Sequence, residues 1–185
     1  IRPWFKNKTA IVKKQNGHGS KTKWPWFKAK KAIVEKFKRD NNLDYQTNEV
    51  IAGVGGKQCI FNLFLALLNP NDEVIIPTPY WVSYTDIVEL TGAIPLLIHC
   101  GIDQSFKMTP EQLEKKINKK TKLVILNSPS NPTGSTYSKN ELKKLADVLI
   151  KYPDIYIMTD DIYEHIRLDE EPFNNIVMVE PKLKS

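Results

Sequence analysis

The sequence predicts an α/β protein with a mostly parallel sheet and flanking helices. From about residue 50 onward, short apolar segments alternate with helical segments, which is typical of parallel strands joined by helices. The segment Leu123–Leu126 is apolar without polar alternation, as strands buried on both faces usually are. Capping boxes mark two of the helix starts that separate the apolar segments.

The expected elements follow in order along the chain. A helix is expected over residues 26–40, because Ala29, Ala32, Ile33 and Phe37 fall near one face. Further strands and helices then alternate. The strands are expected at residues 50–52, 73–76, 93–99, 123–126 and 155–158, and the helices at residues 57–68, 82–91, 109–118 and 138–149.

Local signals fix several of these boundaries. Thr109-Pro110-Glu111-Gln112 and Ser138-Lys139-Asn140-Glu141 are capping boxes, in which a hydroxyl and a carboxyl or amide side chain satisfy free backbone N–H groups at a helix start. Pro77-Thr78-Pro79 is expected to end the second strand. The helix at 57–68 is apolar nearly all round, so we expect it to be buried.

Composition is that of a globular protein. The 185 residues suffice for one domain with a core, and 41% are hydrophobic. The first residues have no apolar stretch of the kind found in secretory signals, and no apolar run is long enough to span a membrane. The two cysteines, Cys59 and Cys100, suit a reducing compartment. We therefore expect a cytoplasmic location and no membrane partner.

Charge is distributed unevenly. Residues 1–40 hold 13 Lys or Arg against 2 acidic residues, whereas the rest of the chain is net acidic. A basic arm can contact nucleic acid, but this one shows no repeated pattern, so nucleic acid is the less favoured partner. We expect residues 1–27 to form an irregular basic N-terminal segment and residues 28–185 to form the folded part.

The first candidate ligand site follows the first expected strand. Gly55-Gly56-Lys57 precedes a helix, and free N–H groups at a helix start can hold a phosphate. It is neither a P-loop nor a dinucleotide fingerprint, because Ile51 and Gln58 stand where those motifs need glycine. The alternative is a tight turn from strand to helix.

Other candidate residues follow the later strands, where ligands of open parallel sheets bind. Trp81 can stack on a flat ring or belong to the core, and Asn131 can present an amide or simply shape a turn. Asp160 can pair with a ligand cation or cap the next helix. Asp161 and His165 have the spacing of two metal ligands, but without a third we expect no metal.

Taken together, these motifs resemble those of the fold-type-I aminotransferases. The segments, in chain order, are Gly55-Gly56-Lys57-Gln58, Pro79-Tyr80-Trp81-Val82-Ser83-Tyr84, Ser128-Pro129-Ser130-Asn131-Pro132-Thr133-Gly134 and Asp160-Asp161-Ile162-Tyr163-Glu164. They look most like bacterial aspartate and aspartate/prephenate aminotransferases. The resemblance is dense from about residue 28 and poor before it. It implies that residues 28–185 are an incomplete large cofactor-binding domain.

The resemblance implies pyridoxal 5'-phosphate as the cofactor, with one role for each matching residue. The backbone of Gly55, Gly56 and Lys57 would hold its phosphate. Trp81 would stack on its ring, Asp160 would pair with its ring nitrogen, and Asn131 and Tyr163 would hydrogen-bond its phenolic oxygen.

The implied activity belongs to amino-acid metabolism: amino-group transfer of the aspartate and 2-oxoglutarate type, with small amino acids and 2-oxo acids as partners and a homodimer as the assembly. Nothing in the sequence matches the family's Schiff-base lysine segment, so we expect no catalytic residue and no activity from these 185 residues alone. A non-catalytic protein that binds pyridoxal phosphate, or a nucleic-acid-binding module, are the alternatives.

Overall fold

The fold is described from a computed structural model, which covers residues 9–10, 25–166 and 171–184. Contacts divide the chain into two units, Ile1–Leu63 with Lys184–Ser185, and Phe64–Leu183, and each is described by itself. The expected basic segment, residues 1–27, lies mostly outside the described residues, and its boundary with the folded part stays a prediction.

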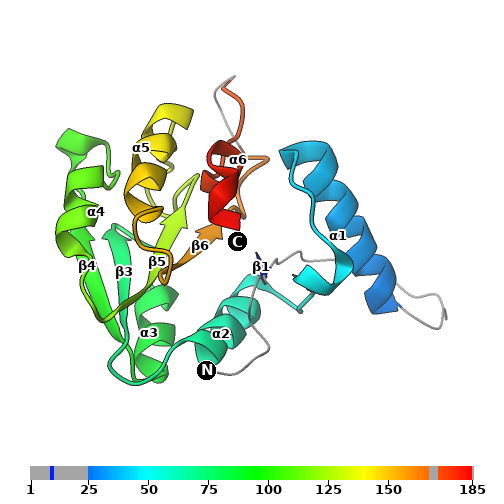
Figure 1. Cartoon of the computed structure of the whole chain (residues 1–185), viewed down its shortest axis with the longest axis horizontal. Helices are drawn as coiled ribbons and strands as arrows, with labels where there is room; N and C mark the ends of the chain where they lie inside the picture. Colours follow the sequence, from blue (N-terminus) through cyan, green and yellow to red (C-terminus); the bar gives the residue numbers. More distant parts are fainter. Residues whose placement is uncertain (1–8, 11–24, 167–170, 185) are drawn as a thin grey trace. The chain divides into compact units, whose positions relative to one another are not determined.

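The second unit is built on a four-stranded parallel sheet, which confirms the predicted α/β class (Figure 1). Each strand pairs in parallel with its neighbours, in the order β4-β3-β5-β6. The carboxyl ends of the strands therefore lie at one edge of the sheet. The strands are β3 (Glu73–Thr78), β4 (Ile94–His99), β5 (Thr121–Asn127) and β6 (Tyr156–Asp160).

Helices flank this sheet (Figure 1). Both predicted capping boxes are present: the Thr109 hydroxyl accepts from Gln112 N, and the Ser138 hydroxyl accepts from Glu141 N. The chain forms α3 (Ser83–Leu90), the 3-10 turn η3 (Ile102–Gln104), α4 (Pro110–Lys116), α5 (Lys139–Leu149), α6 (Ile176–Val179) and the turn η4 (Pro181–Lys184).

The core packs α4, α5 and α6 onto one face of the sheet. Its buried members from the strands and these three helices include Ile75, Ile98, Val124, Leu126, Leu113, Leu142, Leu145, Leu149 and Ile176. Alternate strand residues such as Val74 and Ile125 are also buried. Both faces of the sheet are thus covered, as the apolar run at 123–126 predicts.

The first unit contains α1 (Pro25–Asn41), the 3-10 turn η2 (Thr47–Glu49), and β2 (Val50–Ile51), which pairs in parallel with β1 (Thr9–Ala10). Helix α2 (Gly56–Leu67) begins in this unit and ends in the second. The rings of Phe37 and Tyr45 meet edge to face, 5.5 Å between centroids. The Lys184 ammonium lies over the Tyr45 ring and donates to the Asp44 carbonyl.

Three expectations need correction. Strand β3 does not end before Pro77 but continues to Thr78, because residues 76–78 pair with β4. The pairing of β3 with β5 stops at Ile75, so on that side Pro77 needs no backbone N–H. Leu65 of α2 is 53% exposed, although the helix is apolar on all sides. The weakly patterned tail contains α6, which is too short to show a helical period and starts with Asn175 as its cap.

Candidate functional site

Four of the predicted site residues, Trp81, Asn131, Asp160 and Tyr163, lie in the second unit near the carboxyl ends of its strands. Asp160 ends β6, Asn131 follows β5 by four residues, and Trp81 follows β3 by three. Strands β5 and β6 are direct neighbours, with Asn127 opposite Asp160 in the register. The structure therefore brings two of these strand ends together.

Asp160 is held by three hydrogen bonds. The Tyr84 hydroxyl donates to Oδ2 at 2.6 Å, and the backbone N–H of Ile162 donates to Oδ1 at 3.3 Å. The Asn127 Nδ2 group donates to the backbone oxygen of Asp160 at 2.8 Å. The carboxylate is only partly buried, so a ligand can still approach it.

Asn127 also fixes the turn that carries Asn131. Its Oδ1 accepts from the backbone N–H of Asn131 at 2.8 Å. The turn is closed by Gly134 N, which donates to Ser130 O at 2.8 Å, and Gly134 has a φ of 72°, a conformation that favours glycine. One amide side chain thus links the Asn131 turn to Asp160.

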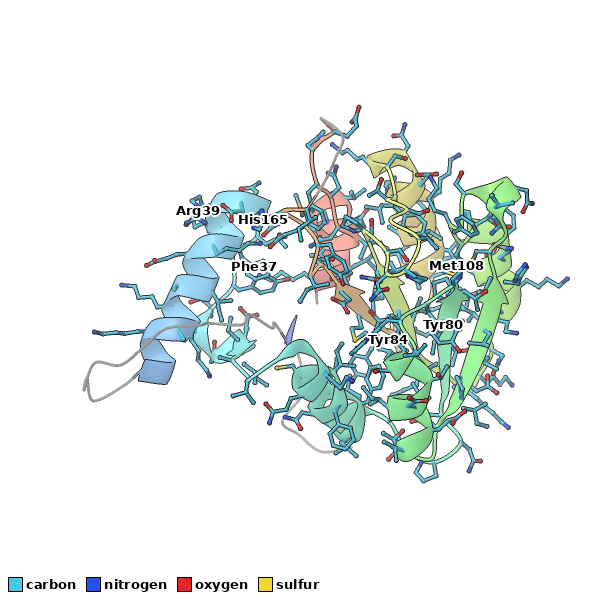
Figure 2. The ribbon with its side chains drawn as sticks, turned by 180° about the vertical axis from the view of Figure 1, so that it is seen from behind. Phe37, Arg39, Tyr80, Tyr84, Met108 and His165 are labelled. Atoms are coloured by element: carbon cyan, nitrogen blue, oxygen red, sulfur yellow. The ribbon has the colours of Figure 1, made fainter. Side chains whose placement is uncertain are left out.

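Trp81 joins this network through Tyr84. Their ring centroids are 5.4 Å apart and the rings meet edge to face at 89°. Tyr84, labelled in Figure 2, is only 1% exposed. Burial and then the nearby Asp160 carboxylate raise the pKa of Tyr84 far above its ordinary value, so its hydroxyl stays protonated.

Tyr163 lies in the turn just after β6 and is partly buried. Its backbone oxygen accepts from Ile166 N at 2.9 Å. It lies close enough to Tyr84 to contribute to that residue's raised pKa. The predicted role of the Tyr163 hydroxyl stays a prediction.

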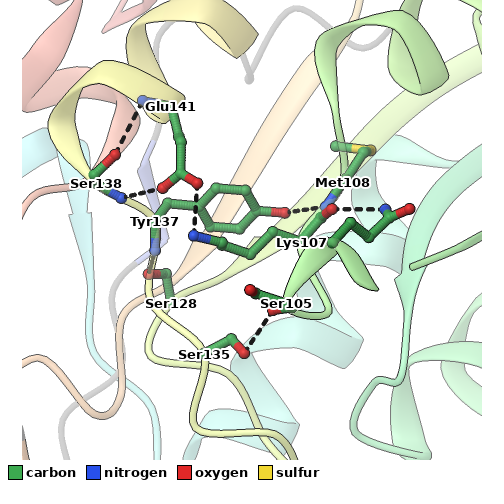
Figure 3. Close-up of polar contacts among 9 residues, drawn as sticks. Ser105, Lys107, Met108, Ser128, Ser135, Tyr137, Ser138 and Glu141 are labelled. Carbon is green, nitrogen blue, oxygen red and sulfur yellow. Dashed lines mark hydrogen bonds and ion pairs between the residues drawn. The ribbon is translucent and has the colours of Figure 1, made fainter. Parts of the chain in front are cut away.

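A second segment secures the turn that carries Asn131 (Figure 3). The Ser135 hydroxyl donates to Ser105 O at 2.8 Å, and Met108 N donates to the Tyr137 hydroxyl at 2.7 Å. Lys107 forms an ion pair with Glu141 at 2.5 Å. These contacts tie residues 105–108 to residues 135–141 and so limit movement of the turn.

Next to the network lies a small, open pocket. Its walls include Tyr84 and Asn127 from the network, together with Tyr80, Lys107 and Ser130. Trp81 and Asp160 do not line it. The pocket therefore adjoins the candidate site rather than containing it.

The predicted phosphate turn belongs to the first unit. Gly56 is the first residue of α2, and Val54 N donates to the Gln58 side chain at 3.1 Å. A Cβ at Gly55 would meet nothing within 4 Å, so the space beside this backbone is open. Lys57 is exposed. An open glycine turn at a helix start suits an anion, and the predicted phosphate role of all three residues stays a prediction.

Asp161 points to a different set of partners from Asp160. Its Oδ2 accepts from Asn175 Nδ2 at 2.8 Å and from the Thr159 hydroxyl at 3.4 Å. Burial is the main cause that raises the pKa of Asp161 from 3.8 to about 7, and the carboxylates of Glu164 and Asp160 add to it. In the described part of the chain, no group of three or more His, Cys, Asp or Glu side chains could hold a metal ion.

Sequence reasoning missed Tyr84, Asn127 and Asn175 as supporting residues. Asn127 could have been singled out, because it is the first polar residue after the apolar run of β5. Tyr84 lies three residues after Trp81, but nothing in the sequence shows that its hydroxyl reaches a residue 76 positions away.

Comparison with known proteins identifies the class. Similar folds occur in solved aminotransferase structures. The aspartate aminotransferase of Rhizobium meliloti matches with a TM-score of 0.82 and 47% identity, over 83% of this chain and 38% of that one. The Thermus thermophilus aspartate aminotransferase with maleate matches with a TM-score of 0.79 and 40% identity, over 84% of this chain and 40% of that one.

The family follows from the sequence. Residues 16–184 match the family model described as aminotransferase class I and II, and the chain belongs to that family. An aspartate/prephenate aminotransferase of Nitrosomonas europaea is 53% identical over 150 residues, which are 81% of this chain and 38% of the relative. A protein of Rickettsia typhi named as a probable aspartate/prephenate aminotransferase is 54% identical over 149 residues, 80% of this chain and 37% of the relative. The chain thus spans well under half the length of these curated relatives.

These comparisons confirm the predicted resemblance to bacterial aspartate/prephenate aminotransferases and the fold-type-I architecture. Within the described residues, no helix is both long enough and apolar enough to cross a membrane.

Proposed function

We propose that the chain is the cofactor-binding part of a pyridoxal-phosphate-dependent aminotransferase that transfers amino groups between aspartate-type amino acids and 2-oxo acids. The network from Trp81 through Tyr84, Asp160 and Asn127 to Asn131 is the observation that carries the proposal. The names of the relatives, at about half identity over most of this chain, support the aspartate/prephenate type. We further propose a homodimeric assembly in the cytoplasm.

The residues present fit this cofactor by the chemistry of their donors and acceptors. Asp160 offers two carboxylate oxygens, each with two lone pairs. The hydrogen bond that Oδ1 accepts from Ile162 N is long, at 3.3 Å. The bond recorded for Asn131 uses its backbone N–H, which leaves its carboxamide for a ligand oxygen. The Asp160 carboxylate suits a cationic ring nitrogen, and the Asn131 carboxamide can donate a hydrogen bond to a phenolic oxygen.

Each residue then has a physical task. Asp160 keeps a proton on the ring nitrogen through a charge-assisted bond, and Trp81 covers the ring face. Asn131 and Tyr163 donate to the phenolic oxygen, while Gly55, Gly56 and Lys57 hold the phosphate. When bound, the cofactor supplies the electron sink that amino-group transfer needs. We propose that the lysine that reacts with the cofactor is not among these 185 residues.

Binding tests this proposal without requiring turnover. Pyridoxamine 5'-phosphate has the same ring and phosphate as the cofactor but no aldehyde, so it cannot form imines with the many surface lysines. Calorimetric titration should show saturable 1:1 binding. Asp160→Ala should weaken it about ten- to a hundredfold, because a hydrogen bond to a charged group is worth about 1.5–3 kcal/mol.

Asp154→Ala is the matched control, because it removes an exposed carboxylate from the loop before the same strand. It should change affinity by less than about twofold, or about 0.4 kcal/mol. Absence of saturable binding, or equal losses in the two variants, would contradict the proposal.

A further inference from the structure

Tyr84 is the residue that connects two of the proposed cofactor contacts. It comes from the first turn of α3, two residues after the exposed Val82, and its own side chain is buried. Its hydroxyl donates to Asp160 Oδ2 at 2.6 Å. Its ring packs edge to face against the ring of Trp81. Among the described residues, no other side-chain hydroxyl forms a hydrogen bond with Asp160.

The direction of this hydrogen bond is fixed. Because the Tyr84 hydroxyl remains protonated at all ordinary pH values, it acts as donor and the Asp160 carboxylate as acceptor. The ionisable groups that act on Tyr84 are Asp160, Tyr163 and Asp161, in falling order. All three favour the neutral phenol, in which the hydroxyl is a hydrogen-bond donor.

The bond also restricts rotation of the carboxylate. Tyr84 holds Oδ2, the Ile162 N–H lies at Oδ1, and Asn127 holds the backbone of the same residue. A carboxylate held at both oxygens presents its remaining lone pairs in one direction. Preorganisation of this kind lowers the ordering cost when a ligand binds.

We propose that Tyr84 is a positioning residue, whose hydroxyl orients the Asp160 carboxylate toward the ring nitrogen of the bound cofactor while its ring supports Trp81. This inference rests on the proposed function. It predicts a specific defect: loss of the hydroxyl should weaken the contact to the ring nitrogen and leave the remaining contacts unchanged.

A pair of ligands separates this defect from a general loss of packing. Pyridoxamine 5'-phosphate is compared with its analogue in which a CH group replaces the ring nitrogen. Tyr84→Phe, which keeps the buried ring, should lower the affinity for pyridoxamine 5'-phosphate about tenfold, or about 1.4 kcal/mol. It should lower the affinity for the analogue by less than about twofold. Tyr156→Phe, at the opposite end of β6, is the control and should change neither.

A double-mutant cycle tests whether Tyr84 acts through Asp160. In the Asp160→Asn background, adding Tyr84→Phe should cost less than about twofold further. A cofactor-free readout accompanies it: the Tyr84 hydroxyl proton should give a slowly exchanging NMR resonance that shifts in Asp160→Asn and is absent in Tyr84→Phe.

The outcomes are distinguishable. If the parent chain binds neither ligand, the proposed function fails and this inference fails with it. If the parent binds but Tyr84→Phe weakens both ligands equally, or neither, the function stands and the positioning role is wrong. If Tyr84→Phe does not fold, 4-aminophenylalanine at position 84 keeps the ring and a donor. It should then retain affinity for the ring-nitrogen ligand within about threefold of the parent, and a tenfold loss would overturn the inference.

Discussion

Replacing Asp161 with asparagine should stabilise the protein in a pH-dependent way. In the fold its pKa is raised to about 7, against 3.8 for the ordinary side chain. Below pH 4 the carboxyl is protonated in both the folded and the unfolded chain and costs nothing. Between pH 4 and pH 7 only the unfolded chain loses its proton, so the free energy of unfolding falls as the pH rises.

The size of the effect follows from the shift. About three pKa units at about 1.4 kcal/mol each give an upper limit of about 4 kcal/mol. Solvent reaches the side chain in part, so we expect about 2–4 kcal/mol at pH 8. Asparagine carries no charge, and its oxygen can still accept the bond that Asn175 donates. The gain from Asp161→Asn should therefore be small below pH 4, rise between pH 4 and pH 7, and be largest above pH 7.

Urea unfolding followed by circular dichroism, at half-unit steps from pH 5 to pH 8.5, measures this difference. Asp154→Asn is the control, since it neutralises an exposed acid close to the same strand. A difference between Asp161→Asn and the parent that does not grow with pH, or a destabilised variant at pH 8, would refute the reasoning.

Three further predictions concern other parts of the chain. Ser138→Ala should lower the free energy of unfolding by about 1 kcal/mol, since it removes the cap of α5, and urea titration at pH 7 will show whether it does. In the same assay Leu145→Ala, at a side chain 1% exposed, should cost about 2–5 kcal/mol, whereas Leu65→Ala should cost less than about 0.5 kcal/mol; similar losses at both would contradict this account of the core. Deleting residues 1–25 should leave the affinity for pyridoxamine 5'-phosphate within about tenfold, about 1.4 kcal/mol, by calorimetry, and a larger loss would show that this segment reaches the ligand.

The sequence was sufficient for features that depend on neighbours along the chain. The caps at Thr109 and Ser138 are local hydrogen bonds between residues three apart, and both were predicted. The strand at residues 123–126 was recognised from its apolar run, because burial on both faces leaves no room for polar alternation, and β5 is buried in this way. The positions of Trp81 and Asn131 after strands followed from the same reading, whereas Asp160, expected after a strand at 155–158, is the last residue of β6.

Contacts between distant residues could not be predicted in this way. The bond from Tyr84 to Asp160 joins residues 76 apart, and the bond from Asn175 to Asp161 depends on where the tail folds back. The continuation of β3 through Pro77 depends on which neighbour that residue faces. The exposure of Leu65 depends on how many elements surround α2. Each of these is decided by tertiary arrangement, which local patterns do not encode.

The two-sided role of Asn127 limits which amino acids its position can accept. Its amide oxygen accepts a hydrogen bond from the backbone N–H of Asn131, and its amide nitrogen donates one to the backbone oxygen of Asp160, at 2.8 Å in both cases. Aspartate has the same size but nothing to give, leucine can do neither, and glutamine is one carbon too long for the gap. Among the twenty side chains, asparagine alone can form both hydrogen bonds with a side chain of that length. Random mutagenesis of position 127 with selection for cofactor binding should therefore recover asparagine.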